Sequence, residues 1–285
     1  MDNKNGKEWD LEITARSKAL EFNFKEIWRY RDLMLLFVKR DFIAQYKQTI
    51  LGPVWHVIQP VLTTVMYLLI FNRIARIPTD GINPTLFYLS GITMWSYFSQ
   101  CLTHTANTFI GNSSIFGKVY FPRMVLPISV VISNLIRLGI QFALLFIAIV
   151  WFDFHGYPLT LSFLWLLLPV LVALIGCIGL GLGIIISSLT TKYRDLSVLL
   201  TFGVQIGMYA TPIVYPLSYV KGKGYEWIIG MNPLTPLLEV YRYILFGKGT
   251  FDLYSVMYTL GFTVFILFAG VMIFNKVEKS FMDTV

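Results

Sequence analysis

The stretch GNSSIFGKVYFPRMVLP, residues 111–127, contains a Gly-Lys pair of the kind found in phosphate-binding loops. In such a loop four residues separate the two glycines, and a Ser or Thr follows the lysine to hold a metal ion. Here five residues separate Gly111 from Gly117, and Val119 follows Lys118. The loop would also need a buried strand before it and a helix after it. The stretch is therefore not predicted to bind a nucleotide.

Other residues that could do chemistry are scattered along the chain. The three histidines, His56, His104 and His155, have no partners at metal-ligand spacing. There is no G-x-S-x-G nucleophile elbow. Cys101 and Cys177 fall in apolar segments, where a small buried side chain is expected and a disulfide framework is not. The sequence thus predicts neither a metal site nor an enzyme active site.

A few ionisable residues lie inside apolar segments, where charge is expensive. Glu239 and Arg242 are three residues apart, which puts them on one helical face and predicts a local pair. Arg137 must face protein or water, and the sequence names no partner for it.

The composition is that of a membrane protein. Of 285 residues, 56% are hydrophobic and 14% are charged, against about 25% charged in soluble domains. Several apolar runs approach or exceed the ~20 residues that cross a bilayer as a helix. The net charge of +7 is spread out, with ten of the 23 Lys and Arg before Gly52 among eight acidic residues. We therefore expect no nucleic-acid binding, and the charged N-terminus predicts no cleaved signal peptide.

The apolar pattern predicts an all-α polytopic membrane protein with a cytoplasmic N-terminal segment (1–52) and a six-span membrane domain (53–285). Residues 24–47 are predicted to form a basic amphipathic helix that lies in the membrane interface, with Trp28, Leu35, Val38 and Phe42 on its apolar face. The alternative is a helix packed against other protein. The predicted spans are 54–71, 86–106, 125–151, 161–189, 196–214 and 253–274.

Residues 225–246 are apolar, but the sequence NPLTP splits them into two short pieces. Neither piece can cross ~30 Å of hydrocarbon at 1.5 Å per residue. We expect a re-entrant pair of helices; the alternative is a single kinked span, which would make seven. With six spans and cytoplasmic termini, 16 of the 23 Lys and Arg lie inside and six outside, and this inside-positive bias favours six.

Close helix packing is predicted for the fourth span, where Gly179 and Gly183 have small-xxx-small spacing. Aromatic residues make up 16% of the chain, and an interfacial belt is their ordinary role. Others could line a path for sugars, whose C–H faces stack on aromatic rings. The candidates for such a channel are Tyr67, Phe71, Trp95, Phe98 and Tyr209.

The connection between the second and third spans, about 111–124, is predicted to be cytoplasmic. It carries exposed aromatic residues beside Lys118 and Arg123, which is typical of a docking surface. A plain loop folded on the headgroups is the alternative.

Residues 28–60, WRYRDLMLLFVKRDFIAQYKQTILGPVWHVIQP, resemble the opening of the membrane subunits of bacterial polysaccharide exporters driven by a separate ATP-binding-cassette protein. The similar features run in the family's order from about residue 28 to 246. They are Arg40-Asp41, Tyr46-Lys47-Gln48-Thr49, Leu51-Gly52, Trp55, Pro60, Phe121-Pro122-Arg123, Leu126-Pro127, Lys192-Tyr193-Arg194-Asp195, Asn232-Pro233 and Arg242.

This resemblance implies export of O-antigen, capsule or teichoic-acid chains across the bacterial inner membrane by two permeases and two ATPases. It implies a coupling helix at 111–124 and outer gate helices at 225–246. ATP and Mg would bind the ATPase partner, and this chain would need no cofactor. The substrate would be a lipid-linked glycan, typically on undecaprenyl pyrophosphate, with Arg29, Arg40 and Lys47 as candidate headgroup contacts. The residues that would contact the ATPase are Ser113, Phe116, Lys118, Tyr120, Phe121, Arg123, Lys192, Arg194 and Asp195.

Three other functions remain open at this point. A drug or small-lipid efflux permease of the same superfamily would have a shallow lipid-facing cleft in place of a continuous conduit. A membrane-embedded enzyme of glycan assembly would need acidic residues near the membrane surface, and the cytoplasmic connections offer only Asp195. A stand-alone ion channel is disfavoured because no charged pore ring or filter-like loop is present.

Overall fold

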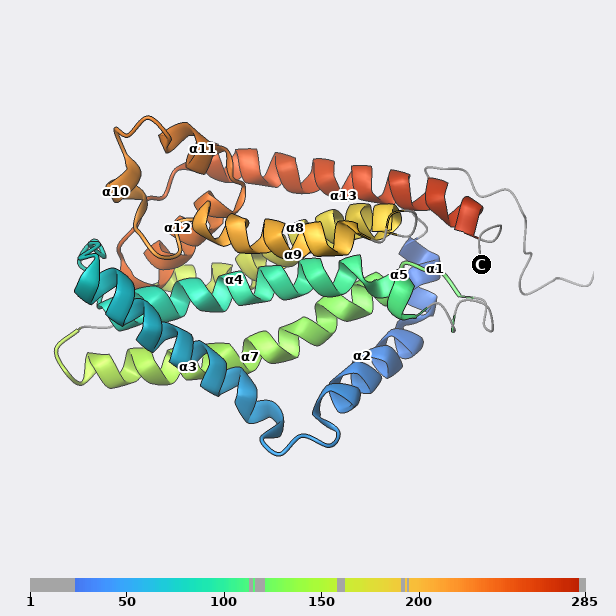
Figure 1. The fold of residues 1–285 in the computed structure, drawn as a ribbon, viewed down its shortest axis with the longest axis horizontal. Coiled ribbons are helices and arrows are strands. Elements are labelled where there is room, and N and C mark those ends of the chain that lie inside the picture. The colour runs from blue at the N-terminus through green and yellow to red at the C-terminus, as the bar shows by residue number, and fades with distance from the viewer. Residues whose placement is uncertain are drawn as a thin grey trace, which may run out of the picture.

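A computed structural model describes residues 24–112, 115, 121–157, 162–190, 193 and 195–281. Every regular element in these ranges is helical, and the helices form an elongated bundle (Figure 1). One short 3₁₀ turn precedes the helix that begins at Trp55, and another precedes the helix that begins at Leu168. The helix that begins at Trp55 continues into a π-helix. The bounds are α1 Phe24–Arg29, α2 Arg31–Tyr46, η1 Gly52–Val54, α3 Trp55–Tyr67, η2 Leu68–Ile74, α4 Pro84–Ala106, α5 Thr108–Gly111, α7 Val125–Asp153, η3 Phe163–Leu167, α8 Leu168–Thr190, α9 Leu196–Tyr209, α10 Leu217–Val220, α11 Glu226–Met231, α12 Leu234–Phe246 and α13 Leu253–Phe281.

Four of the described helices are long and apolar enough to cross a membrane: Gly52–Ile74, Val125–Asp153, Phe163–Thr190 and Leu253–Lys276. The all-helical class is confirmed, whereas six spans remain a prediction. The helix α4 has 23 residues, but its Ser, Thr and Gln side chains make it less apolar than the four. The helix α9 has only 14 residues, about 21 Å at 1.5 Å per residue.

The glycines of α8 allow two neighbouring helices to approach closely, as their spacing predicts. A Cβ on Gly183 would lie 2.5 Å from the Cβ of Thr105 in α4, and one on Gly179 would lie 2.8 Å from the same helix. On another side, a Cβ on Gly270 of α13 would lie 3.0 Å from the carbonyl oxygen of Gly181. The absence of side chains at these points therefore fixes α4, α8 and α13 together.

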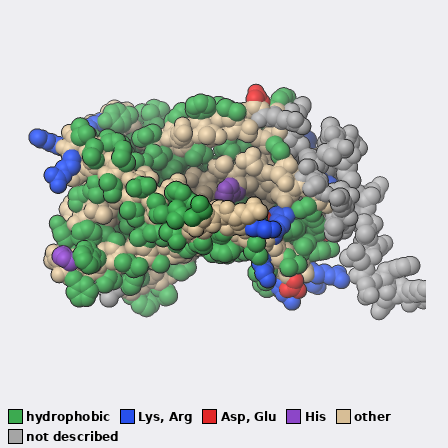
Figure 2. All heavy atoms as spheres, turned by 60° about the horizontal axis from the view of Figure 1, so that its bottom comes forward, with side chains coloured by type: hydrophobic (Ala, Val, Ile, Leu, Met, Phe, Trp, Pro, Cys, Tyr) green, Lys and Arg blue, Asp and Glu red, His purple; other side chains and the backbone are tan. Residues whose placement is uncertain are grey.

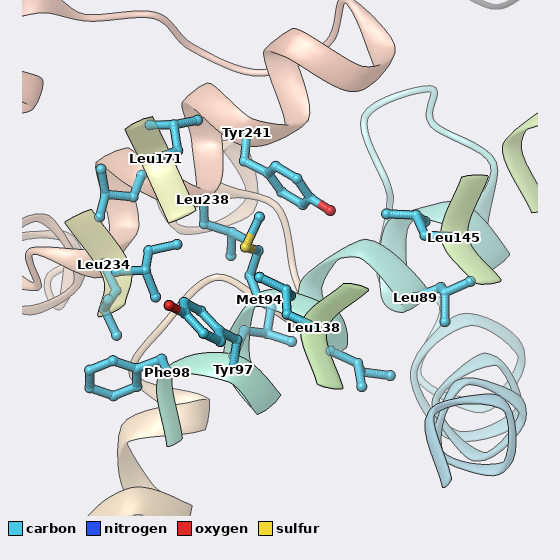
Figure 3. Close-up of a cluster of buried hydrophobic side chains, with 14 of the residues drawn as sticks. Leu89, Met94, Tyr97, Phe98, Leu138, Leu145, Leu171, Leu234, Leu238 and Tyr241 are labelled. Carbon is cyan, nitrogen blue, oxygen red and sulfur yellow. The ribbon is translucent and has the colours of Figure 1, made fainter. Parts of the chain in front are cut away.

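The main hydrophobic core lies where α4 meets α7, α8 and α12. Figure 3 shows side chains of α4 and α12 pointing toward one another in this cluster. Tyr97 and Met94 come from α4, Leu234 and Leu238 from α12, and all four are buried. The short helix α12 is thus held inside the protein, which is where a segment too short to span can persist at membrane depth.

The predicted N-terminal helix is divided at Tyr30, whose ψ of 18° ends α1 before α2 begins. Phe37 and Val38 of α2 are buried, and α2 packs against α7. Val38 of the predicted apolar face is buried, whereas Trp28 and Leu35 are 71% and 61% exposed, as side chains directed at lipid would be. The location of this helix in the membrane interface stays a prediction.

Candidate functional site

A cavity of about 510 Å³ opens between α9, α4 and α8, and we call it the α9 groove. The helix α9 buries only Leu200, and Val204 and Met208 are partly buried, so much of its apolar surface is uncovered in a single chain. Among the described residues, the lining of the α9 groove includes no charged side chain, and its polar groups lie near the loops that follow α9. There the Nδ2 of Asn232 donates to the hydroxyl of Thr211 at 2.8 Å. The groove therefore suits apolar chains or the side chains of another helix.

The predicted channel aromatics of α4 line the α9 groove. The rings of Trp95 and Phe98 lie 5.3 Å apart, and both contribute to the lining. A Cβ on Gly207 of α9 would meet the indole of Trp95 at 3.1 Å, so this glycine allows the close approach. Tyr209, two residues further on, is 55% exposed at the end of α9.

Two more of the predicted channel aromatics, Tyr67 of α3 and Phe71 of η2, lie near the same end of α9 on its other side. The hydroxyl of Tyr67 donates to the Sδ of Met208 at 3.2 Å. Tyr67 also packs edge-on against Phe71, with centroids 5.3 Å apart, and both lie against Tyr88 of α4. The structure thus brings all five candidates to one end of α9, whereas their role in a channel stays a prediction.

A buried ion pair anchors α12, and it confirms the predicted pairing of Glu239 with Arg242. The Nη1 of Arg242 lies 3.5 Å from the carboxylate of Glu239 and donates to the carbonyl of Pro212 at 2.6 Å. The Nη2 donates to the carbonyl of Ile213 at 3.1 Å, and the guanidinium lies 3.8 Å from the ring centre of Phe87. This arginine therefore connects α12 to α4 and to the loop after α9.

Arg137 of α7, which had no predicted partner, is buried in a polar cluster that reaches the surface at His104. Its Nη1 donates to Asn134 at 2.7 Å and to Gln100 at 3.2 Å, and it lies 3.0 Å from the Nδ1 of His104. Tyr46, at the end of α2, also interacts with the guanidinium, at a geometry looser than a hydrogen bond. Burial raises the pKa of Tyr46, and the charge of Arg137 opposes the rise.

This cluster is the part of the site that sequence reasoning missed. Gln100 and His104 are four residues apart in α4, and Asn134 and Arg137 are three apart in α7. Each pair places two polar side chains on one face of an otherwise apolar helix. That spacing is a signal in each helix, but only packing of α4 on α7 shows that the two pairs meet.

The candidate headgroup contacts do not gather at one point. Arg29 and Lys47 are exposed and lie just before and just after α2, at its opposite ends. Arg40 pairs with Asp41 at 2.7 Å and lies over the ring of Phe37. Arg40 is therefore already neutralised, while the other two cations are open to solvent or headgroups.

Of the candidate ATPase contacts, the structure describes Phe121, Arg123 and Asp195. Phe121 is 5% exposed and packs on Phe37 of α2, and Arg123 is 9% exposed. The expected exposure of Phe121 is therefore wrong, because α2 covers it, and Arg123 is buried as well. Contact of these residues with the ATPase stays a prediction. Asp195 is exposed just before α9. Ser113, Phe116, Lys118, Tyr120, Lys192 and Arg194 lie outside the described residues.

The surface seen in Figure 2 is mostly apolar, with the visible Lys and Arg toward its two ends and a hollow between apolar walls. Within the described part of the chain, no group of His, Cys, Asp and Glu could hold a metal ion. The geometry is that of a protein built into a bilayer, with apolar grooves and a small number of buried cations.

Comparison with known proteins gives a consistent family. The ABC-2 type transporter family matches residues 32–246. An O-antigen export system permease protein, RfbA, from Klebsiella pneumoniae is 31% identical over 254 residues, which cover 88% of this chain and 94% of the relative.

More distant relatives align over a similar length. RfbA from Myxococcus xanthus is 26% identical over 92% of this chain and 98% of its own length. The polysialic acid transport protein KpsM from Escherichia coli is 22% identical over 86% of this chain and 93% of its own.

Proposed function

Because this chain belongs to the ABC-2 type transporter family, we propose that it is the permease subunit of an ATP-driven exporter of lipid-linked polysaccharide. It is membrane-embedded and is a polysaccharide export permease. The observation that carries this function is similarity to O-antigen export permeases along nearly the full length of both chains.

The driving force would come from a separate ATPase subunit, which would bind ATP and Mg²⁺. We propose two ATPases and two copies of this permease, with the glycan passing between the permeases. The α9 groove supports a second copy, because its apolar lining suits the side chains of another helix. Lipid tails would cover the remaining apolar surface in either case.

Six spans, both termini in the cytoplasm and location in the bacterial inner membrane complete the proposal. In this arrangement α11 and α12 form gate helices on the outer side, and residues 111–124 couple to the ATPase. The burial of α12 among α4 and α8 supports a re-entrant segment, since broken helices at membrane depth need protein around them.

The substrate would be a glycan carried on undecaprenyl pyrophosphate. The groove aromatics support a sugar path, because apolar sugar faces stack on aromatic rings. A permease for small drugs would use the same groove differently, admitting amphiphiles from the lipid and requiring no polymer conduit.

The test is reconstitution in proteoliposomes with the ATPase encoded beside this chain. Undecaprenyl-linked glycan should stimulate ATP hydrolysis and become accessible to a glycan-specific lectin on the far side. Stimulation by small hydrophobic drugs, with none by the glycan lipid, would favour drug efflux. Transport by the permease alone would contradict the need for a partner.

A further inference from the structure

The polar cluster around Arg137 contains a cation whose charge is not balanced. Arg137 is 7% exposed, and its hydrogen-bonding partners, Gln100, His104 and Asn134, are a neutral amide, an imidazole and a second neutral amide. No described Asp or Glu pairs with it; the nearest acidic influence is Asp41, which is already paired with Arg40. A buried cation without an anion is costly, so such a site favours an anionic ligand.

The guanidinium also retains unused donors. Its Nη1 makes all three close contacts, whereas Nε and Nη2 make no hydrogen bond of good geometry to a described residue. These two nitrogens form the planar fork that binds two oxygens of a phosphate or carboxylate.

A second, independent observation comes from α3. His56 is only 8% exposed, and its Nε2 has no hydrogen-bonding partner among the described residues. Its ring packs edge-on against Tyr46, with centroids 5.7 Å apart. The Tyr46 hydroxyl interacts with the Arg137 guanidinium but makes no hydrogen bond of good geometry. Two buried polar groups beside one unbalanced cation are the donors that a bound anion would satisfy.

The rim of this cluster is apolar. Between α2 and α3, Ile50, Val54 and Trp55 are at least half exposed. Figure 2 shows the molecule with the α2 and α3 side turned forward and a hollow in this face. An anion site with an apolar rim suits an amphiphile, with the charged group bound inside and the hydrocarbon chain along the rim.

We propose that Arg137, His56 and Tyr46 form a binding site for the phosphate group of a lipid, entered sideways between α2 and α3. Guanidinium, imidazole and phenol donors would hold the phosphate oxygens. That the lipid is the polyprenyl pyrophosphate carrier rests on the proposed function; a bulk phospholipid offers the same chemistry.

The experiment measures binding of defined lipids to the purified permease in an uncharged detergent, by native mass spectrometry. Undecaprenyl pyrophosphate should bind at least about tenfold more tightly than undecaprenol, roughly the effect of one charge-assisted hydrogen bond. Arg137→Gln should abolish this preference, and Arg137→Lys should keep part of it. The matched control is Arg76→Gln, an exposed cation at the other end of α3, which should bind as wild type does.

Competition identifies the source of the phosphate. If phosphatidylglycerol displaces undecaprenyl pyrophosphate at equal concentration, the site binds bulk phospholipid; if it does not, the site binds the carrier. Displacement by inorganic pyrophosphate would show that the phosphate group alone is bound. Each of these results supports the anion site.

Equal affinity for undecaprenol and undecaprenyl pyrophosphate, or unchanged affinity in Arg137→Gln, would overturn the inference. Should Arg137→Gln fail to fold, His56→Phe keeps the Arg137 hydrogen bonds and should weaken pyrophosphate-lipid binding several-fold without changing undecaprenol binding. No loss in that variant would also overturn it. Because binding is measured without ATPase or transport, a permease that binds the lipid but exports no glycan would contradict only the proposed function.

Discussion

Arg242 and Arg137 are both buried, yet their guanidinium groups have different surroundings. Arg242 faces the carboxylate of Glu239 and two backbone carbonyls, so its charge is paired and both of its Nη atoms donate, whereas its Nε makes no hydrogen bond to the described residues. Arg137 faces neutral side chains and uses one nitrogen. Burying either charged side chain inside a membrane protein costs free energy. Only the surrounding groups show that Arg242 has a structural role and that Arg137 keeps the capacity to bind a ligand.

Removing Arg242 should destabilise the protein strongly. Arg242→Ala leaves Glu239 buried without its partner, which typically costs about 3–5 kcal/mol. Thermal unfolding in detergent should show a lower Tm than wild type. The control Arg73→Ala removes an exposed cation and should leave Tm unchanged. Equal Tm values in the two variants would show that the ion pair does not anchor α12.

At the scale of elements, the sequence predicts most helix positions because long apolar runs and their breaks are local signals. The runs 86–106 and 125–151 correspond closely to α4 and α7. The face of α2 could not be predicted in the same way. It depends on a break at Tyr30 and on contact between Phe37 and Phe121, which are 84 positions apart in the chain. The predicted exposure of Phe121 is wrong for the same reason.

The polar cluster of Arg137 shows the same limit in the candidate site. The sequence indicates that this charge needs protein or water around it. It does not give the relative rotation of α4 and α7, which decides that Gln100 and His104 are the partners. In contrast, Glu239 and Arg242 are on one helix, so their pairing follows from spacing alone.

The α4–α8 contact should tolerate no added methyl group. In Gly183→Ala the new Cβ would overlap the Cβ of Thr105, 2.5 Å away, and crowd a backbone carbonyl at 3.0 Å. We expect a loss of about 1–3 kcal/mol of stability, measured as a lower Tm. Gly139→Ala in α7, where a Cβ meets nothing within 4 Å, is the control and should be neutral or slightly stabilising. A neutral Gly183→Ala would mean that the two helices are further apart than described.

At the scale of the whole molecule, a single chain leaves its apolar surface unevenly covered. The helix α8 is half buried within its most apolar window, whereas the windows of the first and last spanning helices are 17% buried. A protein that worked alone would leave these surfaces, and α9, entirely to lipid. The proposed second copy would instead cover part of these apolar surfaces.

Cysteine cross-linking can test where the second copy lies. In a background with Cys101 and Cys177 replaced by Ala, Phe202→Cys on the exposed face of α9 should form a disulfide-linked dimer under mild oxidation. Phe265→Cys on α13 has similar exposure, 65% against 59%, and should stay monomeric. A dimer formed through Phe265→Cys and not through Phe202→Cys would place the interface on α13 and contradict the proposed use of α9.

Coupling to the ATPase makes a separate prediction. Phe116→Glu, in the segment proposed to contact the ATPase, should preserve expression and basal ATP hydrolysis while reducing glycan export at least about tenfold, because a charge replaces an apolar contact. Lys223→Glu changes an exposed cation at the other end of the protein and should export normally. Normal export in Phe116→Glu would argue against coupling through this segment.

The glycine contacts that join α4, α8 and α13 also restrict how the protein can change shape. Where a glycine lies this close to the neighbouring helix there is little space for readjustment, so one helix cannot slide along the next without collision. The three helices would therefore move as one rigid body. A displacement of the end of α4 beside α5 would then be transmitted along α4 to Gly91, which lies against the Arg242 side chain of α12.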